Sequence, residues 1–324
     1  MLIPMKLLVL GGTVFLGRHV VDEALAAGCE VTVLNRGTHD VRFPQPVEQL
    51  RGDRDGDLSA LSGRHFDAVV DCSGYTAAQL QRTADVMANQ VGHYVFVSSI
   101  SVYAQFPPGG VFDESAPVTA SAEGYGGGKA RAEEVICAAF PGRVTVLRPG
   151  LIVGPHDPTG RFTYWPLRLA RGGKVLAPGR PDRPVQFIDA RDLAAWCVQL
   201  ALQRRPGVFH CVGPAGTMAG VLQACHQAAA GDIQIVWCDD ATLLRANVAP
   251  WTGLPLWIPE TDPDFGGMLL ASDQHAVQVG LTTRPWVATA RDTLEWARTA
   301  GIGASLVNTL AAEAEAEILV NMGS

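Results

Sequence analysis

Tyr125 and Lys129 lie four residues apart in the stretch EGYGGGKARAEE, residues 123–134. On a helix, residues at this spacing share one face, so both side chains can act on one substrate. The three glycines between them are poor helix formers, each costing roughly 1 kcal/mol relative to alanine. The stretch is therefore either a catalytic pair on a helix or a glycine hinge.

A third polar residue, Ser99, ends the apolar run HYVFVSS. In carbonyl reduction or alcohol oxidation a hydride moves at carbon while a proton moves on oxygen. The pKa of a tyrosine, about 10 when unperturbed, can be lowered by a nearby ammonium and by a positive nicotinamide ring, which makes it a proton donor. A hydroxyl at the end of a strand can orient the carbonyl oxygen. We therefore predict that Ser99, Tyr125 and Lys129 are catalytic.

A glycine turn, GGTVFLG, follows the first apolar run and opens the first helical pattern. In this setting backbone N–H groups can bind a pyrophosphate at a helix N-terminus. Val14 occupies the middle glycine position of the motif, so the packing of the phosphates must differ here. A tight strand–helix turn without a ligand is the alternative. The predicted cofactor contacts in this region are Gly11, Thr13, Phe15, Leu16, Gly17 and Arg18.

The second apolar run ends in Asn35 and Arg36. An acidic residue at this point would bind the ribose of NAD, whereas arginine can pair with the 2′-phosphate of NADP. NADP(H) is therefore favoured and NAD(H) stays possible, the alternative being a solvated surface arginine. In the segment RGDRD, Asp53 is predicted to accept from the adenine amino group, the alternative being an ordinary loop residue. Arg54, which follows it, is also predicted to contact the cofactor.

The elements that would position these residues alternate between apolar runs and helical patterns. Strands are predicted at 6–10, 30–34, 66–71, 93–99 and 143–149, with helices at 16–27, 78–90 and 129–139. This alternation indicates an α/β fold, a doubly wound parallel sheet that binds ligands at the carboxyl ends of its strands.

After Pro149 the chain becomes rich in proline, glycine and tryptophan. We predict a dinucleotide-binding domain over 1–149, to which a segment near 184–212 returns. A smaller, loop-rich substrate lobe over 150–324 would complete the protein. Helices are expected at 190–203, 218–230 and 287–300, where Asp189, Arg191 and Asp192 would cap the first and pair locally. The tail LAAEAEAEIL is predicted to form a helix with a solvated face.

Composition excludes several classes of function. The formal net charge of −7 gives no basic surface for nucleic acid. The seven cysteines are odd in number and never spaced C-x-x-C, which indicates reduced thiols and no zinc site. No segment has the roughly 20 apolar residues that a membrane span needs. We therefore expect a cytoplasmic protein with a small-molecule substrate, no metal and no membrane partner.

Together the motifs GGTVFLG, VSSISVY, YGGGK and LRPGLIVGP resemble the short-chain dehydrogenase/reductase superfamily in its extended, epimerase-like branch. The resemblance implies a Rossmann fold, Tyr125 as the acid/base, Lys129 at the nicotinamide ribose and Ser99 at the substrate oxygen. It also implies that Pro149 lies near the nicotinamide and that a homodimer is possible. The loop after the fourth strand would pass along the cofactor with Cys72, Ser73 and Gly74.

Departures from that resemblance narrow the substrate. Nucleotide-sugar dehydratases carry acidic residues after the active serine, where this chain has Ile100 and Ser101. Sugar-nucleotide enzymes also tend to have an arginine where this chain has Val185, although Arg183 could substitute. Dehydration and a nucleotide-sugar substrate are therefore disfavoured.

Residues of the second lobe are expected to contact the substrate. With Ser101, the predicted contacts are His156, Arg161, Tyr164, Trp165, Trp251 and Trp257, although each of these second-lobe residues could instead be a core or interface residue. The leading interpretation is an NADP(H)-dependent ketoreductase or dehydrogenase. The alternatives are an epimerase with a retained cofactor and a non-catalytic dinucleotide sensor or nucleic-acid-associated scaffold.

Overall fold

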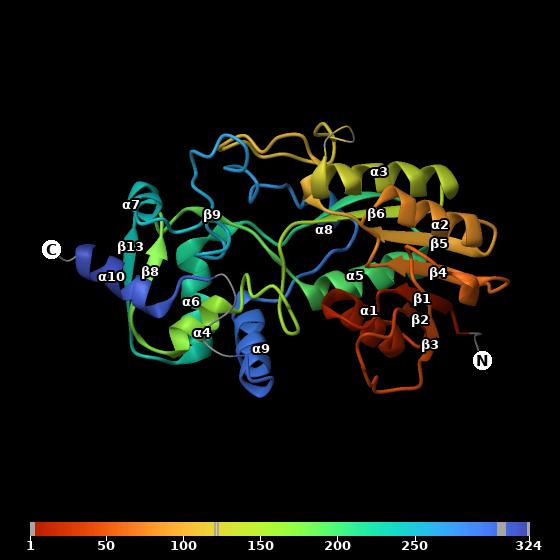
Figure 1. Cartoon of the computed structure of the whole chain (residues 1–324), viewed down its shortest axis with the longest axis horizontal. Helices are drawn as coiled ribbons and strands as arrows, with labels where there is room; N and C mark the ends of the chain where they lie inside the picture. The colour runs from red at the N-terminus through yellow and green to blue at the C-terminus, as the bar shows by residue number, and fades with distance from the viewer. Residues whose placement is uncertain (1–3, 120, 122, 303–308, 323–324) are drawn as a thin grey trace.

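The computed structural model describes residues 4–119, 121, 123–302 and 309–322. A seven-stranded sheet of parallel strands lies at the centre of one lobe, in the order β11-β6-β5-β4-β1-β2-β3 (Figure 1). The strands are β1 (Lys6–Leu10), β2 (Glu30–Asn35), β3 (Glu48–Arg51), β4 (Phe66–Asp71), β5 (Val91–Val97), β6 (Val144–Pro149) and β11 (Gly207–Cys211). The central strands are almost continuously apolar because both of their faces are buried.

Helices cover both faces of this sheet. The helices α1 (Phe15–Ala26) and α5 (Ala190–Gln203) pack together on one face, and α2 (Ala77–Met87) and α3 (Gly124–Ala139) pack together on the other (Figure 1). Each face has its own apolar core. The predicted fold class, a doubly wound α/β sheet, is confirmed.

Two of the four helices that cover the sheet, α2 and α5, are capped by side chains, which satisfy backbone N–H groups that a helix leaves free. Asp189 caps α5 by accepting from the N–H of Arg191, and it also pairs with the Arg191 guanidinium at 2.7 Å. Asp192 pairs at 2.7 Å with Arg284, which comes from the distant segment before the helix α9 (Trp286–Thr299). The predicted capping by this cluster is confirmed, but its ion pairs reach beyond local neighbours.

Two boundaries near the site differ from the prediction. Strand β5 begins at Val91 and ends at Val97, so Ser99 lies beyond the strand rather than within it. Helix α3 begins at Gly124 rather than at residue 129, so the three glycines are helical. Intrinsic propensity predicts the opposite, and tertiary packing overrides it here.

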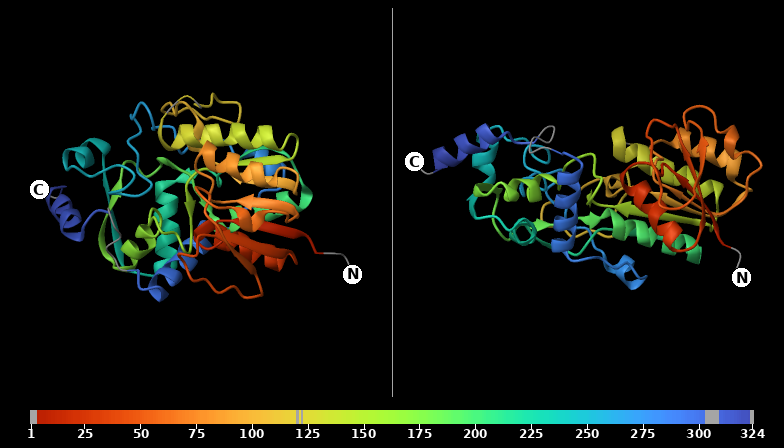
Figure 2. Two further views of the ribbon diagram at one scale, coloured as in Figure 1. Left: turned by 45° about the vertical axis from the view of Figure 1, so that its right-hand side comes forward. Right: turned by 90° about the horizontal axis from the view of Figure 1, so that it is seen from below.

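The second lobe lies at the opposite end of the molecule from the N-terminus (Figure 2). Its core gathers large side chains such as Trp165, Phe187 and Trp257. Its strands β8 (Gly173–Pro178) and β13 (Ile233–Cys238) pair in parallel. The short strands elsewhere in the chain are β7 (Ile152–Val153), β9 (Pro184–Val185), β10 (Ile188–Asp189) and β12 (Gly216–Thr217). The remaining helices are α4 (Tyr164–Ala170), α6 (Met218–Ala229), α7 (Asp240–Arg245), α8 (Gln274–Gln278), α9 (Trp286–Thr299) and α10 (Ala312–Met322).

The C-terminal helix α10 carries an internal acidic residue. Glu313 and Glu317 are exposed, as predicted for a solvated face. Glu315 is buried and pairs with Arg168 of α4 at 2.6 Å, and it also accepts from the N–H of Leu176. The predicted helix with a solvated face is confirmed, and its other face is attached to the second lobe by this ion pair.

Candidate active site

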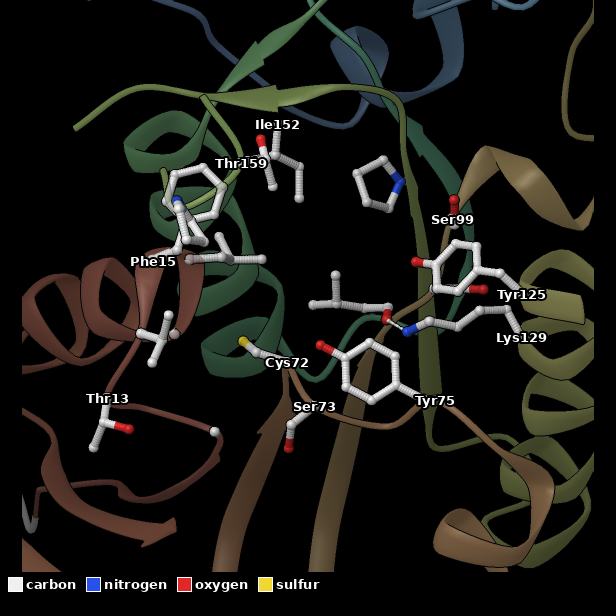
Figure 3. Close-up of a pocket in the computed structure, with 18 of the residues that line it drawn as sticks. Thr13, Phe15, Cys72, Ser73, Tyr75, Ser99, Tyr125, Lys129, Ile152 and Thr159 are labelled. Atoms are coloured by element: carbon white, nitrogen blue, oxygen red, sulfur yellow. Dashed lines mark hydrogen bonds between the residues drawn. The ribbon is translucent and has the colours of Figure 1, made fainter. Parts of the chain in front are cut away.

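A cavity of about 910 Å³ lies at the carboxyl ends of the parallel strands. This is where open α/β sheets bind their ligands. Its walls come from the turn after β1, the ends of β2 and β4, the segment after β5, the start of α3 and loops of the second lobe. Figure 3 shows residues of these segments around one open space.

The glycine turn brings the start of α1 to this cavity. Gly11 has a φ of +86°, and a β-carbon there would lie 2.7 Å from the Cβ of Ser73. A β-carbon on Gly17 would lie 2.0 Å from the carbonyl oxygen of Gly11, so only glycine lets the helix approach the turn. Val14 is exposed, and it gives the N-terminus of α1 no side-chain cap. The free N–H groups there can therefore bind an anion.

The end of β2 is organised around Gly37. The Asn35 side chain accepts from the N–H of Gly37 at 2.7 Å. The guanidinium of Arg51, a residue that sequence reasoning missed, packs on Gly37 where a β-carbon would otherwise sit. Arg36 is exposed and lines the cavity. This edge of the cavity therefore carries cations.

The predicted role of Arg54 in cofactor binding requires correction. Its backbone belongs to the loop that lines the cavity with Asp53, but its guanidinium is buried against Asp71 at 2.5 Å and Thr83 at 3.0 Å. Asp71 also accepts from the hydroxyl of Tyr94 at 2.7 Å. The Arg54 side chain therefore anchors the end of β4 and is not free for a ligand.

Ser99, Tyr125 and Lys129 converge on the cavity from two elements (Figure 3). Ser99 caps the short 3₁₀ helix η2 (Ile100–Val102), and its hydroxyl accepts from the N–H of Ser101 at 3.0 Å. Tyr125 and Lys129 lie on α3, and Tyr125 is 53% exposed. Burial of its phenol raises the pKa of Tyr125, and a hydrogen bond with Ser99 lowers it in part. The expected lowering of that pKa is therefore not found in the protein alone.

The ammonium of Lys129 is buried beneath the cavity. It donates to the carbonyl oxygens of Gly74 at 2.6 Å and Val97 at 2.8 Å. Burial lowers the pKa of Lys129 to about 8, and the negative charge of Asp71 opposes that shift. Two of its three N–H bonds are used by these carbonyls, which leaves one for a ligand.

Close packing explains two of the three glycines of YGGGK, Gly126 and Gly128. A β-carbon on Gly126 would lie 2.0 Å from the carbonyl oxygen of Ser101, and one on Gly128 would lie 3.2 Å from that of Tyr75. The first turn of α3 is therefore pressed against both loops that line the cavity. The stretch is helical in this structure and not a hinge.

The second lobe supplies only part of the predicted set of residues. Ser101, Arg161 and Trp251 line the cavity as expected, together with Asp157 and Thr159, which were not predicted. The Arg161 guanidinium lies 5.6 Å from the centre of the Trp251 ring. One carboxylate oxygen of Asp157 is buried without a hydrogen-bond partner. This wall therefore combines a cation, an aromatic ring and an unsatisfied acceptor.

Four predicted substrate residues lie elsewhere and are corrected. Tyr164, Trp165 and Trp257 are buried in the core of the second lobe. The indole of Trp165 donates there to the carbonyl of Pro255. His156 packs between the rings of His19 and Trp296. A loop rich in aromatic residues indicated substrate contacts, but the aromatic side chains fill the core and the polar residues between them face the cavity.

The remaining predicted cofactor residues divide into two groups. Those that line the cavity are Thr13, Phe15, Leu16, Cys72, Ser73 and Pro149. Arg18 and Gly74 do not line it, although Gly74 supplies a carbonyl to Lys129. Arg183 is also outside, buried against the carbonyl of Ile258 and 3.6 Å from Asp240. Across the described residues, no cluster of three or more metal-ligating side chains occurs, and no helix has the length and apolar character to cross a membrane.

A sequence model of the NAD dependent epimerase/dehydratase family matches residues 7–211. The chain belongs to this family. It is 25% identical over 244 residues to the chloroplast stem-loop binding protein of 41 kDa b of Arabidopsis thaliana, a match that covers 69% of this chain and 63% of that protein.

Solved structures share the fold at low identity. The enzyme WbmH of Bordetella bronchiseptica, in complex with NAD+, is 16% identical with a TM-score of 0.69 over 92% of this chain and 100% of that one. UDP-glucose 4-epimerase of Thermus thermophilus, in complex with NAD, is 20% identical with a TM-score of 0.64 over 91% and 100%. The human epimerase family protein SDR39U1, with NADPH, is 20% identical with a TM-score of 0.62 over 90% and 99%.

Proposed function

We propose that this chain is an NADP(H)-dependent oxidoreductase that transfers a hydride between the nicotinamide and a small carbonyl compound or alcohol. The observation that carries this proposal is the convergence of Ser99, Tyr125 and Lys129 on the cavity that the glycine turn also lines. The cavity extends from the N-terminus of α1 to the start of α3, so it offers both an anion site and a proton donor.

The residues present fit a nicotinamide dinucleotide. The glycine turn and the free N–H groups of α1 would hold its diphosphate, and the loop of Cys72 and Ser73 would lie along it. The third N–H of Lys129 would bind a ribose hydroxyl. When bound, the cofactor would supply or accept the hydride.

The chain's own residues would handle the oxygen of the substrate. The Ser99 hydroxyl would hold the carbonyl oxygen, and Tyr125 would donate its proton to that oxygen as the carbon is reduced. The Lys129 ammonium would stabilise the resulting phenolate through its positive charge. In alcohol oxidation Tyr125 would take the proton back. These steps need no side chain from outside the cavity.

The preference for NADP(H) rests on Arg36. Its guanidinium forms no ion pair or hydrogen bond among the described residues. Arg36 lines the cavity, and the Arg51 guanidinium packs on the neighbouring Gly37. A free arginine at this point suits a 2′-phosphate. The solved neighbours include proteins with NAD and with NADPH, so NAD(H) is the alternative.

The experiment begins with ligand release from the purified protein by denaturation, followed by mass spectrometry of the supernatant. The protein is then titrated with NADPH and NADH by fluorescence and assayed with a panel of ketones, aldehydes and alcohols. We expect NADPH to bind more tightly than NADH and to be consumed in proportion to the product. Failure of both dinucleotides to bind would refute the proposal.

An epimerase that retains its cofactor is a second candidate. The family and the fold likeness to a UDP-glucose 4-epimerase favour it. It would interconvert stereoisomers with no net change in cofactor, because the hydride that leaves the substrate carbon returns to it from the bound cofactor. It is therefore distinguished by the absence of NADPH consumption together with retention of a deuterium label at that carbon. The burial of Arg183 outside the cavity weighs against a nucleotide-sugar substrate.

A non-catalytic role is a third candidate, favoured by the name of the Arabidopsis relative. A net charge of −7 opposes binding to nucleic acid. A gel-shift assay with an RNA stem-loop at two salt concentrations tests it. Binding to RNA without turnover of any carbonyl compound would favour this role over the enzyme.

A further inference from the structure

The ammonium of Lys129 is surrounded by three aromatic rings. It lies 4.9 Å from the ring centre of Phe96, 5.1 Å from that of Tyr75 and 5.9 Å from that of Tyr125. Within the part of the chain that the structure describes, no carboxylate lies within 4 Å of it. A buried charge needs compensation, and here the partners are two carbonyl oxygens and these rings.

Tyr75 differs from the other two rings. Phe96 is fully buried in the core beneath the sheet end, and Tyr125 is the proposed proton donor. Tyr75 directly follows Gly74, lines the cavity and is 52% exposed. Figure 3 shows the Lys129 side chain between the rings of Tyr125 and Tyr75. Tyr75 therefore closes the side of the ammonium that Tyr125 leaves open.

We propose that Tyr75 is a positioning residue of this site, whose aromatic ring holds the Lys129 ammonium in place and stabilises its positive charge. The face of an aromatic ring attracts a cation electrostatically, and this attraction is stronger where water is excluded. The tight approach of Gly128 to the Tyr75 carbonyl fixes the loop against α3, which keeps the ring beside the lysine. This inference rests on the proposed function in one respect only, the binding of a cofactor ribose by Lys129.

Other charged groups also act on Lys129. Asp71 at the end of β4 and Glu133 on α3 favour its charged form, whereas Arg54 and burial disfavour it. The thiol of Cys72 lies on the same loop as Tyr75. None of these groups is altered by a change at Tyr75, so a substitution there isolates the effect of the ring.

The chain has three lysines, Lys6, Lys129 and Lys174, which makes a direct test possible. Protein labelled with ¹³C at the lysine ε-carbon is titrated by NMR without any ligand, and the exposed Lys6 and Lys174 serve as internal references. The signal that disappears in the Lys129→Arg variant is assigned to Lys129. The variants are Tyr75→Leu and Tyr75→Met, which remove the ring, and Tyr75→Phe, which keeps it. Phe265→Leu is the control, because it removes a 50% exposed ring outside the cavity.

In Tyr75→Leu and Tyr75→Met the pKa of Lys129 is expected to fall by roughly half a unit to one unit, the size of a cation–π contact. Tyr75→Phe and Phe265→Leu are expected to titrate like the wild type. An unchanged or raised pKa in both ringless variants would overturn the inference, because burial or entering water would then outweigh the ring.

Dinucleotide affinity gives a second readout. The ringless variants are expected to bind NADPH about two- to fivefold more weakly, whereas Tyr75→Phe binds like the wild type. An equal loss in Tyr75→Phe would show that the hydroxyl acts and not the ring, which also overturns the inference. If the wild type binds neither NADPH nor NADH, the proposed function fails, and the ligand-free lysine titration still decides the role of Tyr75.

Discussion

Gly126 lies so close to Ser101 that a β-carbon on it would sit 2.0 Å from the Ser101 carbonyl oxygen. This contact joins the first turn of α3, which carries Tyr125, to the short helix that Ser99 caps. The distance between the two proposed catalytic hydroxyls is therefore set by a residue that has no side chain.

Gly126→Ala should separate these two elements. We expect a loss of roughly 1–3 kcal/mol in the free energy of unfolding, the usual result of overpacking, together with a fall in kcat. Gly220→Ala is the matched control, since Gly220 is the third residue of α6 as Gly126 is of α3, and a β-carbon there meets only ordinary contacts. Urea unfolding that shows equal stability for both variants would contradict this account.

Tyr125→Phe should abolish turnover with little effect on dinucleotide affinity. The change removes only the phenolic oxygen, which would donate the proton, and it preserves the ring beside Lys129. Steady-state kinetics and a fluorescence titration on the same preparation measure the two effects. Wild-type kcat in this variant would rule out Tyr125 as the acid.

Arg36→Glu should weaken the binding of NADPH more than that of NADH, because it replaces the free cation at the cavity edge with an anion. Arg205→Glu makes the same charge change at an exposed residue just before β11, at the other edge of the sheet. It should leave the NADPH-to-NADH affinity ratio unchanged. Equal losses for both dinucleotides in Arg36→Glu would show that Arg36 does not bind the 2′-phosphate.

Because of Lys129, we expect the free energy of unfolding to vary with pH in the alkaline range. Its pKa is about 8 in the folded protein against an ordinary value of 10.5. Between these values the unfolded chain holds one more proton, so the free energy of unfolding gains a contribution that rises with pH. The difference in this free energy between the wild type and Lys129→Met should therefore grow from pH 8 to 10.5. A flat difference would mean that the buried lysine keeps its ordinary pKa.

Glu315→Gln should destabilise the second lobe, because it leaves the buried Arg168 without a counter-charge. Breaking a buried pair by removing one partner costs about 3–5 kcal/mol. Glu313→Gln makes the same change at an exposed position of the same helix and should be nearly neutral. Thermal unfolding measures both, and similar melting temperatures would show that α10 does not depend on this pair.

The sheet could be predicted from the sequence, and so could the convergence of Ser99, Tyr125 and Lys129 on one cavity, because local patterns mark both. Each of these patterns is contained in a stretch of about ten residues: the apolar strands, the glycine turn, and the spacing of Tyr125 and Lys129. The loops of the second lobe are different. There, residue type predicted that His156, Tyr164 and Trp165 contact the substrate. The packing of distant segments decides instead which side chains are buried.

The roles of Arg54, Tyr75 and Glu315 depend on contacts between remote parts of the chain. Arg54 meets Asp71 through the fold of β4, and Glu315 meets Arg168 across 147 residues. Tyr75 is part of no recognised sequence motif. It lies beside Lys129 only because the loop after β4 packs on α3 in the folded chain. Burial and partner charge are properties of the folded chain, so residue type alone could not give them.

Strand β11 completes the sheet beside β6, although it follows much of the second lobe in the chain. The two lobes are therefore not interchangeable modules. A fragment that stops at Pro149 would leave β6 as an apolar edge strand, which invites association with other chains. An exchange of substrate lobes between relatives must instead cut the chain on both sides of β11 and α5 and leave them with the sheet.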